Sequence, residues 1–329
     1  MTVKKFFIPA ILLFISICVY AGEHLTIGDT VKKETYLYAV KGTDSLYLDR
    51  YELVFHKTED IKPCVIFIFG GGFAAGTRDR ESYLPYFRYL AEKGFIVASI
   101  DYRLGLKNVG EQKDLNAQKF ISIFENAITI AVEDLYDATN FILRQADEWN
   151  IDRNMIIANG SSAGAITVMH GEYNICNQTA LSRKLPKDFN YAGIISFAGA
   201  IFSKTGNIKW TNKPAPILMF HGDGDRNVPY NKIELLQYGF YGSKHISKQL
   251  SFMESPYYFY DVENAAHEMA DIPMDENRDE INTFLDKYII QGRPLMMQNA
   301  VKQTDKPKLE KNLGIRDYIN ANFGIGDGM

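Results

Sequence analysis

The sequence predicts an α/β fold, in which a mostly parallel central sheet carries helices on both faces. Six short segments are apolar without alternation, which is typical of strands buried on both sides. Amphipathic helical patterns separate several of them, and strands that alternate with helices form a parallel sheet with helical crossovers. The six segments are residues 65–69, 95–100, 155–158, 192–197, 217–220 and 257–260.

An N-terminal antiparallel hairpin is predicted before these strands. Residues 36–53 alternate between apolar and polar side chains around a turn at Gly42, as the two arms of a hairpin do. Helical periodicity appears between and after the strands. Gly94 ends the first helix and Pro294 lies just beyond the last, and both residue types commonly follow helix ends. The predicted helices span residues 83–93, 125–149 and 277–290.

Two segments do not fit the alternation of strands and helices, residues 104–124 and residues 295–329. Either segment could cover the carboxyl edge of the sheet, and an unstructured or simply packed tail is the alternative. No linker or internal repeat interrupts the chain before Pro294. One α/β domain is therefore predicted over residues 22–294, followed by a C-terminal extension of unknown role.

The first 21 residues have the pattern of a secretory signal peptide. Lys4 and Lys5 precede an apolar stretch over residues 6–20, and Ala21 completes a small-residue cleavage site. An uncleaved membrane anchor is the alternative, because the stretch approaches the length of a membrane span. The pattern predicts an exported protein, periplasmic or secreted, with no stable membrane insertion once residues 1–21 are removed.

Charge and cysteine content exclude several classes of protein. The chain has 36 Lys and Arg against 40 Asp and Glu residues, and no basic cluster that would attract a nucleic-acid backbone. Cys64 and Cys176 are the cysteines that remain after the predicted signal. Cys64 is expected to be a buried hydrophobic residue, and a disulfide between the two is the alternative in an exported protein. The sequence does not indicate an oligomeric state.

Residues 160–164, Gly-Ser-Ser-Ala-Gly, predict a nucleophile elbow with Ser162 at its centre. A serine on a sharp strand-to-helix turn has a strained backbone, and it needs small neighbours. The turn also places the N–H of Ala163 at the start of a helix, where a developing negative oxygen is stabilised. Ser162 is therefore the candidate nucleophile, and Ala163 is a candidate oxyanion-hole residue.

A glycine run predicts the rest of the oxyanion hole. Residues 70–72 are three glycines that follow an apolar strand. Without side chains, their backbone N–H groups can turn toward a carbonyl oxygen, so Gly71 and Gly72 are candidates to bind an oxyanion. Phe73, which follows them, is expected to line the substrate pocket.

Asp225 and His267 complete the order Ser, Asp, His, in which each residue follows a predicted strand. A serine nucleophile needs such a base and an acid that orients it. Asp223 is an alternative acid and His245 an alternative base. The spacing to Pro229 favours Asp225, and His245 lies in a polar helical segment, which favours His267.

On these residues the chain resembles the α/β-hydrolase superfamily, and within it the acetyl esterase and carboxylesterase branch related to hormone-sensitive lipase. Four motifs match in order within residues 36–290. They are Phe69-Gly70-Gly71-Gly72 for the family's His-Gly-Gly-Gly, Asp101-Tyr102-Arg103 for Asp-Tyr-Arg, Gly160-Ser161-Ser162-Ala163-Gly164 for Gly-Asp-Ser-Ala-Gly, and residues 221–229 for His-Gly-x-x-Asp-x-x-Val-Pro. The resemblance implies an α/β-hydrolase fold with nucleophile Ser162, acid Asp225, base His267 and an oxyanion hole of Gly71, Gly72 and Ala163.

Two positions depart from the family pattern. Phe69 replaces a histidine that holds the glycine loop, and Ala266 replaces the glycine before the base. Asp101 and Arg103 are expected to form a structural pair that braces the loop. In its overall sequence pattern, rather than in a particular motif, the chain also resembles exported bacterial esterases that act on acetyl or feruloyl groups of plant polysaccharides.

These expectations describe a serine hydrolase that cleaves a small-molecule or glycan ester through an acyl-enzyme. A peptidase or amidase on the same fold, and an inactive hydrolase-like binding protein, are the alternatives. No cofactor or metal is expected. A dinucleotide fingerprint over residues 70–75 would leave the elbow unexplained, and a calcium-loop spacing from Asp223 has Val228 where glycine is required.

Overall fold

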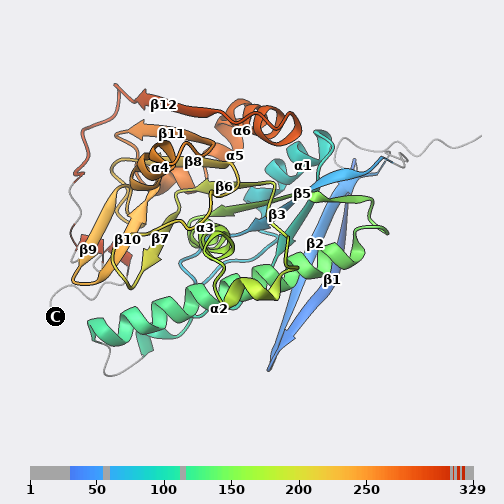
Figure 1. Ribbon diagram of the computed structural model, residues 1–329, viewed down its shortest axis with the longest axis horizontal. Coiled ribbons are helices and arrows are strands. Elements are labelled where there is room, and N and C mark those ends of the chain that lie inside the picture. Colours follow the sequence, from blue (N-terminus) through green and yellow to red (C-terminus); the bar gives the residue numbers. More distant parts are fainter. Residues whose placement is uncertain are drawn as a thin grey trace, which may run out of the picture.

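The computed structural model describes residues 30–54, 60–111 and 116–311, together with residues 314, 317, 318, 321 and 322. The predicted signal peptide lies outside these residues. The described chain is built around a nine-stranded sheet (Figure 1). In sheet order its strands are β1 (Val31–Lys41), β2 (Asp44–Leu53), β4 (Ile96–Ile100), β3 (Lys62–Ile68), β5 (Ile151–Ser161), β6 (Gly193–Phe197), β8 (Ile217–Gly222), β11 (Tyr257–Glu263) and β12 (Met296–Lys302).

The sheet is parallel except at its N-terminal edge. The predicted hairpin forms β1 and β2, and β2 joins the sheet antiparallel to β4. From β4 to β12 all neighbouring strands run parallel. The six apolar segments are all strands of this parallel part, and β4, β6 and β8 are buried along their whole length. The predicted fold class is confirmed.

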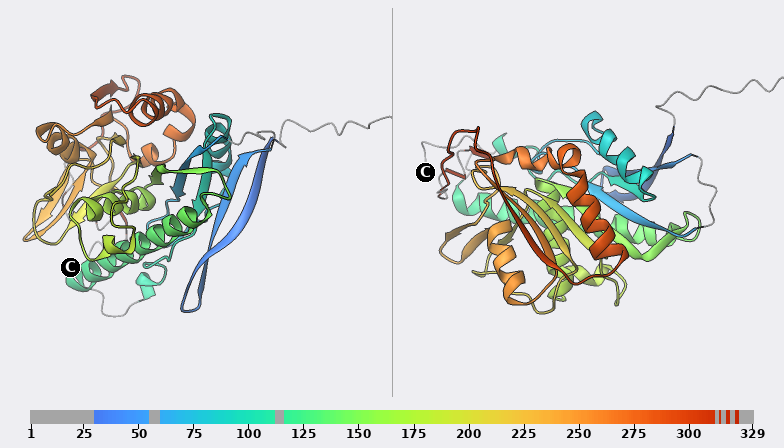
Figure 2. Two further views of the ribbon diagram at one scale, coloured as in Figure 1. Left: turned by 45° about the vertical axis from the view of Figure 1, so that its right-hand side comes forward. Right: turned by 90° about the horizontal axis from the view of Figure 1, so that it is seen from above.

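Helices cover both faces of the sheet (Figure 2). On one face α1 and α6 lie together, and the hydroxyl of Tyr89 donates to the carbonyl of Arg278 at 2.8 Å. On the other face α2 packs on α3, where Tyr136 donates to the carbonyl of Gly171 at 2.6 Å. The helices are α1 (Leu84–Glu92), α2 (Ala117–Gln145), α3 (Ala163–Cys176), α4 (Ser243–Phe252), α5 (Pro273–Glu276) and α6 (Arg278–Phe284), with 3₁₀ helices at Glu81–Tyr83, Val109–Glu111, Leu181–Lys184 and His267–Ala270 and a π-helical turn at Leu285–Ile290.

The helix α2 begins earlier than the periodicity predicts. It starts at Ala117, inside the segment 104–124 that the sequence leaves between elements. The side chain of Asn116 accepts a hydrogen bond from the Lys119 N–H at 2.9 Å, and this cap satisfies one of the free donors at the helix start. The first turns of α2 thereby reach the region above the sheet where the predicted site lies.

The sheet also continues past Pro294, where the predicted domain ends. Part of the C-terminal extension forms β12, which pairs in parallel with β11. Residues of β12 alternate between exposed and half-buried, as expected for an edge strand, and this pattern is weaker than that of the buried strands. The structure also contains a separate three-stranded antiparallel sheet that the sequence patterns do not predict. It consists of β7 (Ala200–Ser203), β10 (Tyr238–Gly242) and β9 (Lys232–Leu235).

The structure also bears on the predicted state of the two cysteines and on membrane-spanning helices. Cys64 in β3 and Cys176 in α3 are both buried free thiols, so the alternative disulfide does not form. Burial raises the pKa of the Cys64 thiol to about 12, which keeps it protonated. Among the described residues, no helix has both the length and the apolar character needed to cross a bilayer.

Candidate active site

Ser162 lies on the sharp turn between β5 and α3. Its φ of 51° and ψ of −115° place it in a strained region for a residue with a side chain. The Ser162 N–H donates to the carbonyl of Phe197 at 2.9 Å, which ties the turn to β6. A Cβ on Gly160 would collide with the backbone of Gly164, and one on Gly164 with the carbonyl of Ile68. The glycine spacing is therefore a steric requirement of this turn.

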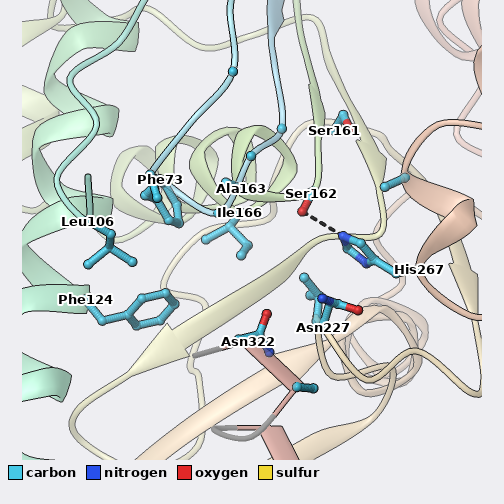
Figure 3. A pocket seen from close by; sticks show the side chains of 18 of the residues that line it. Phe73, Leu106, Phe124, Ser161, Ser162, Ala163, Ile166, Asn227, His267 and Asn322 are labelled. Carbon is cyan, nitrogen blue, oxygen red and sulfur yellow. Dashed lines mark hydrogen bonds between the residues drawn. The ribbon is translucent and has the colours of Figure 1, made fainter. Parts of the chain in front are cut away.

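The structure brings the three residues predicted as nucleophile, acid and base together. Ser162 Oγ lies 2.8 Å from His267 Nε2 (Figure 3), and His267 Nδ1 lies 2.8 Å from Asp225 Oδ2. Asp225 follows β8 and His267 follows β11, so both stand at the carboxyl ends of neighbouring strands. In this arrangement the serine hydroxyl can donate to Nε2 while the Nδ1–H donates to the carboxylate.

The carboxylate of Asp225 is fully buried and surrounded by donors. Its Oδ1 accepts the N–H groups of Asn227 at 2.8 Å and Val228 at 3.0 Å. Its Oδ2 faces His267, and His221 Nε2 lies 3.3 Å from it. Burial alone would raise the pKa of Asp225, but the hydrogen bonds from His221 and His267 outweigh it and hold the pKa well below its usual range. Asp225 therefore stays ionised beside His267.

The imidazole of His267 is a stronger base than an ordinary histidine. Burial opposes its charged form, but the hydrogen bond and the negative charge of Asp225 outweigh burial and raise the pKa above 6.5. Asp271 and Glu268 add smaller contributions in the same direction. A base with a raised pKa takes the proton of a hydroxyl more readily.

The two alternative residues form their hydrogen bonds elsewhere. Asp223 accepts the N–H of Asn264 at 2.8 Å, which holds the loop after β11 beside the loop after β8. His245 lies on α4, and its Nε2 is 2.8 Å from Asn207 Oδ1. Within the described residues, no group of three or more His, Cys, Asp or Glu side chains is arranged to hold a metal ion.

Tyr102 holds the glycine loop that follows β3. Its hydroxyl donates to the carbonyl of Phe69 at 3.1 Å, and the two rings pack with centroids 4.6 Å apart. The aromatic ring that replaces the family's histidine thus holds the loop by packing. The predicted pairing of Asp101 with Arg103 is wrong, because each binds a different partner. These partners are Arg78 for Asp101, at 2.7 Å, and Asp134 on α2 for Arg103, at 2.8 Å.

The predicted oxyanion-hole residues lie on the wall of one cavity beside the nucleophile. Gly71 and Gly72 have φ values of 129° and 63°, which favour glycine. Ala163 is the first residue of α3, so no carbonyl within the helix accepts its N–H. A Cβ on Gly70 would lie 3.2 Å from the Cβ of Ser162, which shows how closely the glycine loop approaches the elbow. N–H groups from two elements are thus available near Ser162.

The cavity has a volume of about 1170 Å³ and includes Ser162 and His267 in its lining. Figure 3 shows an apolar side on the left of the view, away from His267. Phe73 is buried there, and its ring meets that of Phe124 edge-on with centroids 6.1 Å apart. The residues of this side are Phe73, Leu106, Phe124 and Ile166. Phe73 therefore stands where the sequence predicts it, and part of the segment 104–124 lines the cavity.

Phe202 and Tyr230 lie outside the lining of this cavity. Phe202 packs against Phe124 with ring centroids 5.6 Å apart, and so supports the apolar side from behind. Tyr230 lines a smaller neighbouring cavity, and its hydroxyl donates to Asp261 at 2.5 Å.

Part of the cavity wall comes from the C-terminal extension, whose role the sequence leaves unknown. Tyr318, Ala321 and Asn322 line the cavity together with Asn227. No local motif marks these residues, because only the path of the chain after β12 brings them to the site. The contact of His221 with Asp225 was also not predicted, although His221 opens the motif that contains the acid.

This architecture, with a sharp strand-to-helix turn at Ser162 between β5 and α3, is the α/β-hydrolase fold. Residues 51–201 match the family model described as BD-FAE. The chain is also 26% identical to Gut esterase 1 of Caenorhabditis elegans over 173 residues, a match that covers 52% of this chain and 27% of that protein. The chain thus spans only about a quarter of the length of that relative.

Solved structures of esterase 2 from Thermogutta terrifontis share the fold. The apo form has a TM-score of 0.56 at 19% identity and covers 80% of this chain and 96% of that one. The propionate-bound form gives a TM-score of 0.56 at 19% identity, with 80% and 95% covered. The protein therefore has the α/β-hydrolase fold, and over the matched residues it is similar to the BD-FAE family and to proteins described as esterases.

Proposed function

We propose that the protein is a serine esterase, which hydrolyses carboxylic esters through an acyl-enzyme. The observation that carries this proposal is the hydrogen-bonded line from Ser162 through His267 to Asp225, which opens into a cavity. The similarity to proteins described as esterases favours esters over amides as substrates, and this step is an analogy.

The acylation step uses the three side chains in order. Ser162 Oγ attacks the carbonyl carbon of the ester while His267 Nε2 takes the hydroxyl proton, and Asp225 stabilises the imidazolium. The electron pair of the carbonyl moves onto its oxygen, which is stabilised by the N–H groups of Gly71, Gly72 and Ala163. The bond to the leaving oxygen then breaks, and His267 protonates the alcohol that departs.

Deacylation repeats these steps with water. His267, neutral again, takes a proton from a water molecule that attacks the acyl carbon, and the same N–H groups stabilise the oxyanion. Collapse of this intermediate breaks the bond to Ser162 Oγ, which regains its proton from His267. The acid product leaves, and no cofactor takes part in either step.

The cavity supports a proposal about the ester itself. Its apolar side, formed by Phe73, Leu106 and Phe124 among others, suits an acyl group, and the volume of about 1170 Å³ leaves room for more than an acetyl group. We assign short-acyl and carbohydrate-linked esters, acetyl and feruloyl esters among them, as the substrates.

We also assign residues 1–21 as an export signal. N-terminal sequencing of the exported protein should therefore give Gly22 as its first residue.

Covalent labelling tests the assignment of the nucleophile. Paraoxon, an organophosphate, should inactivate the protein with one phosphoryl group per chain, located by mass spectrometry on the peptide that contains Ser162. Hydrolysis of p-nitrophenyl acetate should be lost in proportion to labelling, and the matching anilide should be cleaved far more slowly. Labelling elsewhere, or ester hydrolysis that survives complete labelling of Ser162, contradicts the proposal.

The raised pKa of His267 predicts the pH dependence of kcat/KM. His267 acts as a base only when neutral, so kcat/KM should fall as the pH decreases through its pKa, with a midpoint above 6.5. Replacing Asp271 with asparagine removes a charge that raises this pKa, and the midpoint should move to lower pH. A midpoint below 6.5 in the unmodified protein would rule out the assigned environment of His267.

A further inference from the structure

We propose that the described residues of the C-terminal segment, 303–311 together with Tyr318, Ala321 and Asn322, are part of the active site, and that Asn322 determines specificity for the alcohol half of the ester. This inference rests on the proposed esterase function and adds a residue that lies outside the motifs of the fold. Tyr318, Ala321 and Asn322 line the same cavity as Ser162.

The described residues of this segment are docked on the loops that carry the acid and the base. Beyond β12, Lys306 pairs with Glu268 at 3.4 Å, next to the base His267. A Cβ on Gly224, next to the acid Asp225, would lie within 2.6 Å of Leu309. The segment therefore packs against both loops.

Further charge pairs and one buried ring hold the segment in place. Lys311 Nζ lies 2.6 Å from Asp223 and Asp317 lies 3.7 Å from Arg226. Exposed pairs of this kind contribute little individually. Tyr318, by contrast, is 7% exposed and packs edge-on against Phe240 with ring centroids 5.5 Å apart. Its burial is the main anchor for this part of the wall.

The orientation of the Asn322 amide follows from its hydrogen bonds. Its Nδ2 donates to the carbonyl of Tyr318 at 2.9 Å and to the carbonyl of Arg226 at 3.4 Å. Because only the amide nitrogen can donate to these carbonyls, the oxygen Oδ1 must point the other way. Figure 3 shows the Asn322 oxygen directed into the pocket. Asn322 thus presents a hydrogen-bond acceptor to the substrate.

This acceptor lies on the side of the site where the alcohol leaves. His267 must reach the leaving oxygen to protonate it, so the alcohol half has to lie beside His267. The Asn322 amide donates a hydrogen bond to the carbonyl of Arg226, the residue that follows Asp225. Asp225 is in turn hydrogen-bonded to His267. The apolar side of the cavity lies away from this loop (Figure 3). An alcohol with a free hydroxyl can donate to Asn322 Oδ1, and an apolar alcohol cannot.

Two acetates that differ only in the alcohol test this inference. A monoacetylated methyl xyloside carries free hydroxyls on a six-membered ring, and cyclohexyl acetate has a ring of the same size without them. Replacing Asn322 with leucine should lower the ratio of kcat/KM for the xyloside to kcat/KM for cyclohexyl acetate by about tenfold. Asn299→Leu on β12, where the amide donates to Tyr258, should keep the ratio.

The ratio separates a contact with the substrate from a structural role. If Asn322→Leu leaves the ratio unchanged, or lowers both kcat/KM values equally, Asn322 does not select the alcohol and the inference is overturned, while the esterase function stands. Asn322→Ala in the full chain also removes the acceptor and should show the same loss of selectivity; an unaltered ratio in that variant also overturns the inference. If the unmodified protein hydrolyses none of the three esters, that is, the acetylated xyloside, cyclohexyl acetate and p-nitrophenyl acetate, the proposed function itself fails.

Discussion

Replacing Ser162 with alanine is expected to lower kcat for acetyl esters by about 10⁶-fold, because removal of the nucleophile leaves no group that can form the acyl-enzyme. The backbone of Ser162 is strained in either variant, and the change removes only one hydrogen bond, to His267. The free energy of unfolding should therefore change by about 1 kcal/mol or less. Initial rates with p-nitrophenyl acetate, together with thermal unfolding, measure both effects.

The neighbouring Ser161 provides a matched control. It is buried in the same elbow and carries the same hydroxyl, but Figure 3 shows it directed away from His267. Ser161→Ala should retain most of the activity. A loss with Ser161→Ala as large as that with Ser162→Ala would mean that the elbow has been disturbed as a whole, and a fully active Ser162→Ala would eliminate the acyl-enzyme mechanism.

Replacing Asp225 with asparagine is expected to lower kcat by roughly 10⁴-fold, through the tautomer of His267. The N–H groups of Asn227 and Val228 hold Oδ1 of residue 225 in place, so the new amide nitrogen must take the position of Oδ2. That nitrogen is a donor and faces His267 Nδ1. The imidazole must then carry its proton on Nε2, where it cannot accept the proton of Ser162.

Asp223→Asn is the matched control for this variant. Asp223 accepts the N–H of Asn264 through Oδ1, and asparagine can keep that bond. The variant loses a partly exposed ion pair with Lys311 but no contact with His267, and should therefore lose far less activity than Asp225→Asn. Steady-state kinetics on the two purified variants decide between the two carboxylates, and a larger loss with Asp223→Asn would reverse the assignment.

Much of the fold was predictable because it depends on local patterns. Strands buried on both faces are apolar at most positions without alternation, so β4, β6 and β8 stand out in the sequence. The edge strand β12 has one exposed face and a weaker pattern. The start of α2 was missed because a capping side chain, Asn116, rather than apolar periodicity decides where it begins.

The candidate site was predictable to the extent that its chemistry is encoded in short motifs. The elbow requires glycine at residues 160 and 164 because their Cβ atoms would meet backbone, and this requirement is visible in the sequence. In the sequence, only the spacing to Pro229 favours Asp225 over Asp223 as the acid. The structure places Asp225 2.8 Å from His267 and directs Asp223 to the N–H of Asn264.

By itself, the sequence determined the parallel α/β fold, the elbow around Ser162 and the glycine loop, since each follows from burial or steric limits acting within a few residues. Only the tertiary structure decided which carboxylate meets His267, that His221 shares it, and that Asn322 lines the pocket. Two of these contacts join segments far apart along the chain, and the third depends on how the loop after β8 turns Asp225 back toward His221. Their geometry depends on how loops and the C-terminal segment pack, and packing across such separations leaves no periodic pattern in the sequence.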